Sequence, residues 1–179
     1  GGYQGIMDIL QTLKEKATQA ADDALSSSQR TAINSQVNKL LAQIDDITDE
    51  TKFNGMKLVN GDFSSKTFQT GEATSDTMLV TLNNADSAAL SLSGISITTQ
   101  SGATSAMTSV DTAISSLSGY IQTVGNYKAI LTSKESALSL AITNTEAVRS
   151  SVEDADFAKE QMEVMKLQIL QQTALASFS

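Results

Sequence analysis

Apolar residues recur every three or four positions from Met107 to Ile142, and this spacing constrains the fold more than any other feature. Steps of three and four keep one face of an α-helix apolar. The chain contains no proline, the residue that most often interrupts a helix. The pattern therefore predicts one long helix whose stripe needs partners. The stripe consists of Met107, Val110, Ile114, Leu117, Ile121, Val124, Lys128, Leu131, Glu135, Leu138 and Ile142.

Two positions of this stripe, Lys128 and Glu135, are charged and lie one heptad apart. Within a coiled coil, such residues weaken the seam but help to fix its register. After an acidic interruption at 153–156, we expect a second helical segment. Its apolar residues are Val152, Phe157, Met162, Met165, Ile169 and Leu170.

Two shorter helices are predicted near the amino end. The first has apolar residues at Ile6, Ile9, Leu13, Ala17, Ala20 and Ala24. Ser26 and Gln29 have capping-box spacing, so the second helix should begin there. Its stripe alternates steps of four and three without error, as in a two-stranded seam. These residues are Ile33, Val37, Leu40, Ile44 and Ile47.

Turn signals replace helical spacing in the middle of the chain. Phe53-Asn54-Gly55 predicts a turn, and Asn60-Gly61 is a dipeptide favoured in tight hairpins. Residues 68–71 and 78–82 are expected to be short strands, and 91–98 to be extended.

The predicted fold class is therefore mainly α with a small β section (α+β), an elongated antiparallel helical bundle capped by β-hairpins. We expect one elongated domain over 1–179. It contains amino-terminal helices at 3–50, a β-hairpin section at 51–100 and long carboxyl-terminal helices at 101–179. The helix seam is predicted at Ile33, Val37, Leu40, Ile44, Ile47, Val110, Ile114, Leu117, Ile121, Val124, Leu131, Leu138 and Ile142.

Composition removes most catalytic chemistry. The 179 residues include no cysteine and no histidine, which excludes thiolate nucleophiles, imidazole bases and the usual transition-metal sites. A formal net charge of −8 opposes binding to nucleic acid or anionic membranes. We therefore expect no enzyme activity, no cofactor, and no nucleic-acid or membrane partner.

The acidic residues are interpreted as structural or solvent-exposed groups rather than as a metal or catalytic site. Glu153, Asp154 and Asp156 lack the looped spacing of a calcium site, so a polar break between helical segments is expected. Asp45-Asp46 and Asp49-Glu50 are expected on a solvated face, with ion pairs to lysines of a neighbouring subunit as the alternative.

Three stretches of the chain resemble bacterial flagellins. The first is ILQTLKEKATQA (9–20) followed by QRTAINSQVNKLLAQIDDITDETKFNG (29–55). The second is MKLVNGDFSSKTFQTG (56–71), and the third is AITNTEAVRSSVEDADFAKEQMEVMKLQILQQTALA (141–176). The block EDADFAKE leading into QILQQ is highly specific. The resemblance covers nearly the whole chain apart from roughly 74–104.

The resemblance implies a structural subunit of the extracellular flagellar filament. Its partners would be other flagellin subunits and, for the full-length protein, an export chaperone and the type III flagellar export apparatus. It also implies a fragment of the inner filament core, with the channel-lining terminal helices mostly missing. A hook-filament junction protein shares the helical plan but not the EDADFAKE and QILQQ block. Another secreted coiled-coil surface protein would lack the hairpin motifs.

Many flagellins carry an arginine-rich stretch and a glutamate that animal Toll-like flagellin receptors engage. An ungapped alignment places Thr12 at an arginine of that pattern, Lys16 at a leucine and Gln36 at the glutamate. Lys14 and Gln19 belong to the same surface. A hydroxyl and an ammonium do not replace a guanidinium fork and a buried leucine, so weak receptor binding is predicted.

Overall fold

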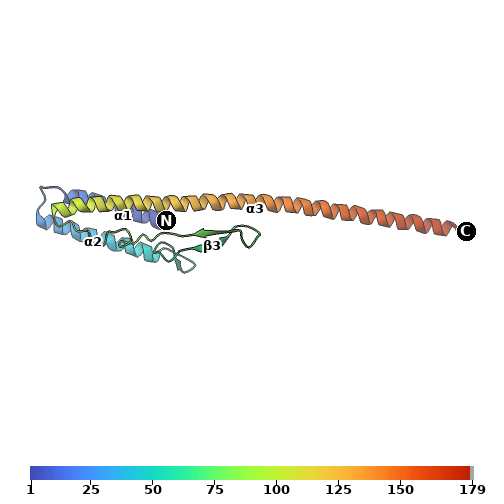
Figure 1. Cartoon of the computed structure of the whole chain (residues 1–179), viewed down its shortest axis with the longest axis horizontal. Helices are drawn as coiled ribbons and strands as arrows, with labels where there is room; N and C mark the ends of the chain where they lie inside the picture. Colours follow the sequence, from blue (N-terminus) through green and yellow to red (C-terminus); the bar gives the residue numbers. More distant parts are fainter. Residues whose placement is uncertain (178–179) are drawn as a thin grey trace. The chain divides into compact units, whose positions relative to one another are not determined.

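The computed structural model describes residues 1–177, which form helices and short antiparallel strands as the sequence predicts (Figure 1). The chain divides into two compact units, Gly1–Leu131 and a second that begins at Thr132. The helices are α1 (Gly2–Ala20), α2 (Ser27–Glu50) and α3 (Gln100–Ser177). The strands are β1 (Lys52–Phe53), β2 (Met56–Lys57), β3 (Lys66–Gln69) and β4 (Thr77–Val80). The last two residues of the expected domain lie outside the described part.

Helices α1 and α2 form a helical hairpin. The predicted capping box is confirmed, because Gln29 N donates to Ser26 Oγ at 3.3 Å and Ser26 N donates to Gln29 Oε1 at 2.8 Å. Arg30 then reaches back from α2 and donates to the carbonyls of Ala20 at 2.8 Å and Asp22 at 2.7 Å. The first of these bonds satisfies the Ala20 carbonyl at the end of α1, which has no partner within the helix.

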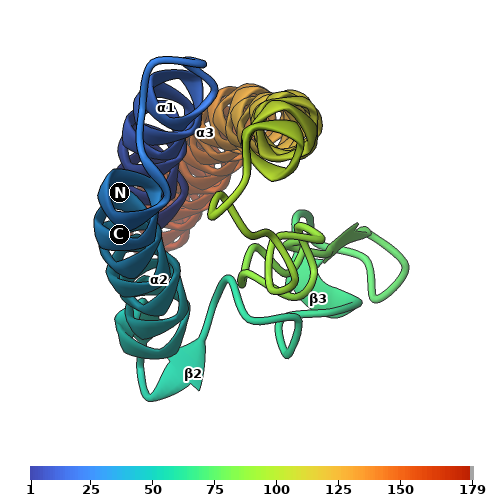
Figure 2. The same cartoon turned by 90° about the vertical axis from the view of Figure 1, so that its left-hand side faces the viewer.

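Helix α1 is antiparallel to both α2 and the first part of α3. The ring of Tyr3 lies 5.9 Å from that of Tyr120, and Lys14 pairs with Asp111, so rising numbers on α1 meet falling numbers on α3. Figure 2 shows these three helices side by side, with the segment that precedes α3 looping beside α2. The seam on α3 uses small residues, which permit close approach of the helices. Its buried residues are Ala103, Ala106, Val110, Ala113 and Leu117.

The two hairpins confirm part of the sequence expectation. Asn54 and Gly55 have φ of 51° and 75°, the two positive values that a tight two-residue hairpin requires; they join β1 to β2. Strands β3 and β4 pair antiparallel from Lys66 opposite Val80 to Gln69 opposite Thr77.

Two local predictions in this region are wrong. Asn60-Gly61 does not join paired strands. Its carboxamide instead closes a turn on Asp62, accepting from the Asp62 amide at 3.0 Å and donating to the Asp62 carboxylate at 2.9 Å. Residues 91–98 form turns and irregular backbone rather than a strand.

That irregular segment completes the core of the first unit. Leu92 and Ile97 are fully buried, and polar side chains of α2 fix the backbone around them. Asp45 accepts from the Ser87 amide at 2.8 Å and hydroxyl at 3.0 Å, and Asn34 accepts from the Ile97 amide at 3.0 Å. The segment lacks regular hydrogen bonding of its own, so α2 positions it.

We expect Leu92→Ala to lower the free energy of unfolding by about 2–5 kcal/mol, because it removes a fully buried side chain from a packed site. Leu79→Ala is the matched control: this leucine is 61% exposed, so its truncation should change stability by at most about 0.5 kcal/mol. Guanidinium chloride unfolding followed by circular dichroism measures both. Equal effects of the two substitutions would contradict the assigned role of the segment.

Candidate assembly surface

The predicted seam residues of α2 lie on its buried face, but the fully buried positions differ in part. Ile33, Val37 and Ile44 are buried, whereas Leu40 and Ile47 are only partly buried. Leu41 and Thr48 are buried instead. Helix α2 is flanked by α1 on one side and by the loop before α3 on the other, so its buried face lies between these neighbours. A heptad pattern assumes a single partner helix.

On α3 the predicted seam is covered only in its first part. Val110 and Leu117 are buried, and Ile114 and Ile121 are partly buried. Val124 is already 36% exposed, and exposure continues through Leu131, Leu138 and Ile142. The charged positions Lys128 and Glu135 are exposed as well.

In the second unit, every described residue is exposed. We call residues 138–175 the apolar segment of α3, because large apolar side chains stand in water throughout it. They are Leu138, Leu140, Ile142, Val148, Val152, Phe157, Met162, Val164, Met165, Leu167, Ile169, Leu170 and Leu175. Soluble proteins rarely leave so many neighbouring apolar side chains uncovered unless they bind a partner.

These side chains point to all sides of the helix. At about 100° per residue, Val164, Met165 and Leu170 project in three directions about 100–140° apart. Because these apolar side chains are distributed around the helix among charged ones, a single partner helix, which covers only one stripe, would leave some of them exposed. On one side, Met162, Met165, Lys166 and Ile169 line a groove, and their spacing is that of a hole that receives a side chain in knobs-into-holes packing.

The β-hairpins of the first unit also expose apolar residues. Phe53 is 63% exposed and faces the exposed Met56 across β1 and β2. Phe68 and Leu79 on β3 and β4 are exposed too. The hairpin tip and the apolar segment are therefore candidate contact surfaces.

The acidic groups of α2 are partly used within the chain. Asp45 binds Ser87, and Asp49 pairs with Lys57 at 2.7 Å. The hydrogen bond and charge of Lys57 lower the pKa of the Asp49 carboxyl, and the same contact raises the pKa of the Lys57 ammonium. Pairing with a neighbour's lysines stays a prediction for Asp46 and Glu50.

The acidic block on α3 does not break the helix, so the expected interruption at 153–156 is wrong. Helix α3 continues through it. Arg149 pairs with Glu146, three residues before it, and approaches Glu153, four residues after it, at 3.9 Å. Such spacings place opposite charges side by side on a helix and modestly stabilise it. Within residues 1–177 no group of three or more carboxylates is arranged to hold a metal ion.

The five residues of the predicted receptor surface do not share one face. By helical position, Thr12, Lys16 and Gln19 lie on one side of α1. Lys14 lies on another side, where its ammonium pairs with Asp111 of α3 at 2.5 Å. Gln36 is exposed on α2.

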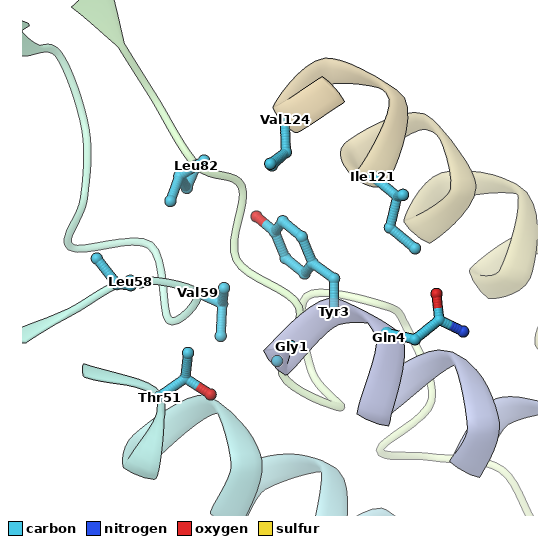
Figure 3. A pocket seen from close by; sticks show the side chains of 10 residues that line it. Gly1, Tyr3, Gln4, Thr51, Leu58, Val59, Leu82, Ile121 and Val124 are labelled. Carbon is cyan, nitrogen blue, oxygen red and sulfur yellow. The ribbon is translucent and has the colours of Figure 1, made fainter. Parts of the chain in front are cut away.

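A hollow of about 440 Å³ opens at the start of α1 (Figure 3). Tyr3 stands at its centre among Leu58, Val59, Leu82 and Ile121. The Tyr3 hydroxyl donates to the Asn83 carbonyl at 2.6 Å. Burial, and then Tyr120, raise the pKa of Tyr3 to about 12.

Sequence reasoning missed this hollow and the ties around it. Tyr127 of α3 accepts from the Thr81 amide at 3.3 Å, so α1 and α3 each bind the backbone at 81–83 through a tyrosine hydroxyl. The one sequence feature that could have indicated these contacts is the seven-residue spacing of Tyr120 and Tyr127, which puts both rings on one face of α3.

Two family models match the ends of the chain. The bacterial flagellin N-terminal helical region matches residues 1–64, and the bacterial flagellin C-terminal helical region matches residues 107–179. The chain belongs to the bacterial flagellin family. Flagellins are structural proteins of the flagellar filament. Among the helices described over residues 1–177, none is long and apolar enough to cross a membrane.

Curated relatives extend the similarity over nearly the whole chain. Flagellin FlaB1 of Treponema pallidum is 30% identical over 189 residues, covering 97% of this chain and 66% of the relative. Flagellar filament core protein flaB2 of Brachyspira hyodysenteriae is 30% identical over 191 residues, covering 98% and 67%. The flagellin of Listeria monocytogenes is 29% identical over 191 residues, covering 96% and 65%. This flagellin chain thus spans about two thirds of the length of these relatives.

Solved structures agree with the fold. The crystal structure of Bacillus cereus flagellin matches with a TM-score of 0.64 and 25% identity, over 73% of this chain and 76% of that one. FliC from Burkholderia pseudomallei matches with a TM-score of 0.63 over 72% of this chain and 95% of that one. Its identity is 16%, so this second likeness concerns the fold alone.

The raised pKa of Tyr3 predicts a loss of stability in alkali. The folded chain keeps the Tyr3 proton up to about pH 12, whereas an unfolded tyrosine loses it near about pH 10. The folded state therefore binds more protons in this window, and stability falls as the pH rises through it. Tyr3→Phe should show a smaller fall between about pH 8 and about pH 11, measured by guanidinium chloride midpoints. Identical losses in both proteins would contradict the assignment.

Proposed function

We propose that this flagellin is a structural subunit of the extracellular bacterial flagellar filament. Its apolar segment would be covered by other flagellin subunits. The observation that carries the proposal is the all-round exposure of apolar side chains on residues 138–175 of α3. An exposed helix of this kind has no stable environment in water except among partner helices.

The number of partners follows from the same geometry. Because one neighbouring helix covers one stripe, the apolar segment needs two or more neighbours. A filament supplies them, since repeated heterologous contacts between identical subunits propagate instead of closing. The Met-lined groove adapts its shape to such neighbours, because the thioether chain is flexible.

The β-hairpin end is proposed to contact the next subunit along the filament. Phe53 and Met56 form an exposed apolar pair at that tip. The two compact units would then act as one elongated subunit over 1–179, with the first unit rigid through its own core and the second dependent on neighbours for burial.

We assign this flagellin no enzymatic activity and no cofactor. Its sequence lacks cysteine and histidine, and its hollow is lined mainly by apolar groups around the hydroxyl of Tyr3, which is already bonded to Asn83. An export chaperone and the type III flagellar export apparatus are proposed partners of the whole protein. A hook-filament junction role has less support, because the relatives described above are named as flagellins or as a flagellar filament core protein.

Assembly can be tested by placing charge on the apolar segment. We expect Ile169→Glu to abolish filaments and motility when the whole gene complements a non-motile strain, because a carboxylate would be buried between subunits. Gln171→Glu adds the same charge on the side of the helix that already carries Glu160, and should retain filaments. Electron microscopy of the cell surface and sedimentation of sheared filaments report the outcome. Normal filaments from the Ile169→Glu protein would overturn the proposal.

Weak recognition by the animal Toll-like flagellin receptor remains part of the proposal. Thr12 and Lys16 replace an arginine and a leucine of the receptor-binding pattern, and Gln36 replaces its glutamate. The antiparallel register that brings Gly5 to Ile47 and Gly2 to Thr51 places Gln36 at about the level of Lys16. These substitutions therefore affect one region of the α1–α2 surface.

Restoring the pattern should restore recognition. We expect the triple variant Thr12→Arg, Lys16→Leu, Gln36→Glu to activate a receptor reporter cell line at least about tenfold more strongly than the parent, since interface residues of this kind dominate binding energy. Lys14→Arg, which keeps the charge opposite Asp111, is the control and should leave activity low. Strong activation by the unaltered protein would contradict the prediction.

A further inference from the structure

The chain contains two Asn-Gly dipeptides in opposite structural settings. Asn54-Gly55 forms the exposed turn between β1 and β2, and Asn60-Gly61 lies in the loop that follows β2. Asn-Gly is the dipeptide most prone to spontaneous deamidation. Glycine has no side chain to hinder the attack of its backbone nitrogen on the preceding asparagine carboxamide. The two sites share this chemistry and differ only in their surroundings.

We propose that Asn54 is a selective deamidation site of this flagellin and that its fold protects Asn60. In the reaction, the Gly55 nitrogen loses its proton to base and bonds to Asn54 Cγ. The bond from Cγ to Nδ2 breaks, and ammonia leaves. Water then opens the resulting succinimide at either carbonyl and gives aspartate or isoaspartate. The step needs only water and base, so no oxidant or partner protein is required.

The surroundings of Asn54 leave its carboxamide available. Asn54 and Gly55 are exposed, and a side-chain atom added at Gly55 would meet nothing within 4 Å. Among the side-chain hydrogen bonds described for residues 1–177, none involves the Asn54 carboxamide. Strands β1 and β2 have two residues each, and such short hairpins open readily. Opening frees the backbone rotation that brings the Gly55 nitrogen to Cγ.

The surroundings of Asn60 restrain both reacting groups. Its Oδ1 accepts from the Asp62 amide at 3.0 Å and its Nδ2 donates to the Asp62 carboxylate at 2.9 Å. Gly61 packs against the Asn84 side chain, which would lie 3.3 Å from an added Cβ. The backbone on either side is tied by the bonds from Ala85 N to Val59 O and from Leu82 N to Phe63 O, each 2.9 Å. Attack at Asn60 therefore requires several contacts to break together.

The modification would change the exposed turn between β1 and β2. Either product adds a negative charge between the exposed side chains of Phe53 and Met56. Isoaspartate also lengthens the backbone by one atom, which the two-residue turn cannot accommodate in its present register. The hairpin would therefore lose its shape as a subunit ages. This inference does not depend on the proposed filament role.

Trypsin separates the two sites, which makes the test direct. Cleavage after Lys52, Lys57 and Lys66 places Asn54 in the peptide Phe53–Lys57 and Asn60 in the peptide Leu58–Lys66. The folded chain is incubated in mildly alkaline buffer, and mass spectrometry follows the conversion of amide to carboxylate in each peptide. The same incubation in guanidinium chloride gives the rates without structure. An isoaspartyl methyltransferase assay identifies the rearranged product.

The quantity compared is the deamidation rate at Asn54 divided by that at Asn60. We expect this ratio to be at least about tenfold higher in the folded chain than in denaturant, because two hydrogen bonds hold the Asn60 carboxamide. Asp62→Ala removes one of them and should accelerate Asn60 several-fold, whereas the neighbouring Ser64→Ala should not. A ratio that rises less than this on folding, or faster reaction at Asn60 than at Asn54 in the folded chain, would overturn the proposal. The ratio in the unaltered chain decides it even if Asp62→Ala disturbs the loop.

Discussion

The structure depends on a mismatch between the apolar stripe of α3 and the chain available to cover it. Within the stripe, Val110 and Leu117 are buried, and the side chains are exposed from Val124 onward. In the buried part, alanines let α3 approach its neighbours closely, and the first unit gains a core. In the exposed part, none of the described residues 1–177 covers the apolar side chains. One helix therefore provides both part of the core of the first unit and the uncovered apolar side chains for which we propose other subunits as partners.

Polar anchors determine the shape of the first unit where regular structure ends. Asp45 and Asn34 of α2 hold the irregular segment before α3 by its amides. The hydroxyls of Tyr3 and Tyr127 hold the backbone at 81–83 from two helices. The anchors at Ser87 and Ile97 satisfy amides of buried residues, which would be costly to leave without partners. Leu92 and Ile97 can then be buried although they belong to no strand or helix.

The sequence predicted features that depend on local spacing. The capping box at Ser26 and the turn at Asn54-Gly55 require residues within a few positions of each other, and both were identified correctly. Wrong predictions arose where distant contacts decide. Asn60-Gly61 does not close a hairpin because the backbone on either side of it bonds to Ala85 and Leu82 instead. Leu41 replaces Leu40 because α2 has two neighbours. The acidic block at 153–156 remains helical, and the approach of Arg149 to Glu153 at 3.9 Å favours the helix only modestly.

The central claim is that residues 138–175 obtain their burial from other subunits. Hydrogen–deuterium exchange of the backbone amides, compared between the free chain and assembled filaments, tests it most directly. In the free chain, amides of this segment should exchange much faster than those of α1, because few contacts oppose local opening. In filaments they should become at least as protected as α1. Equal protection in the free chain, or rapid exchange that persists in filaments, would contradict the account.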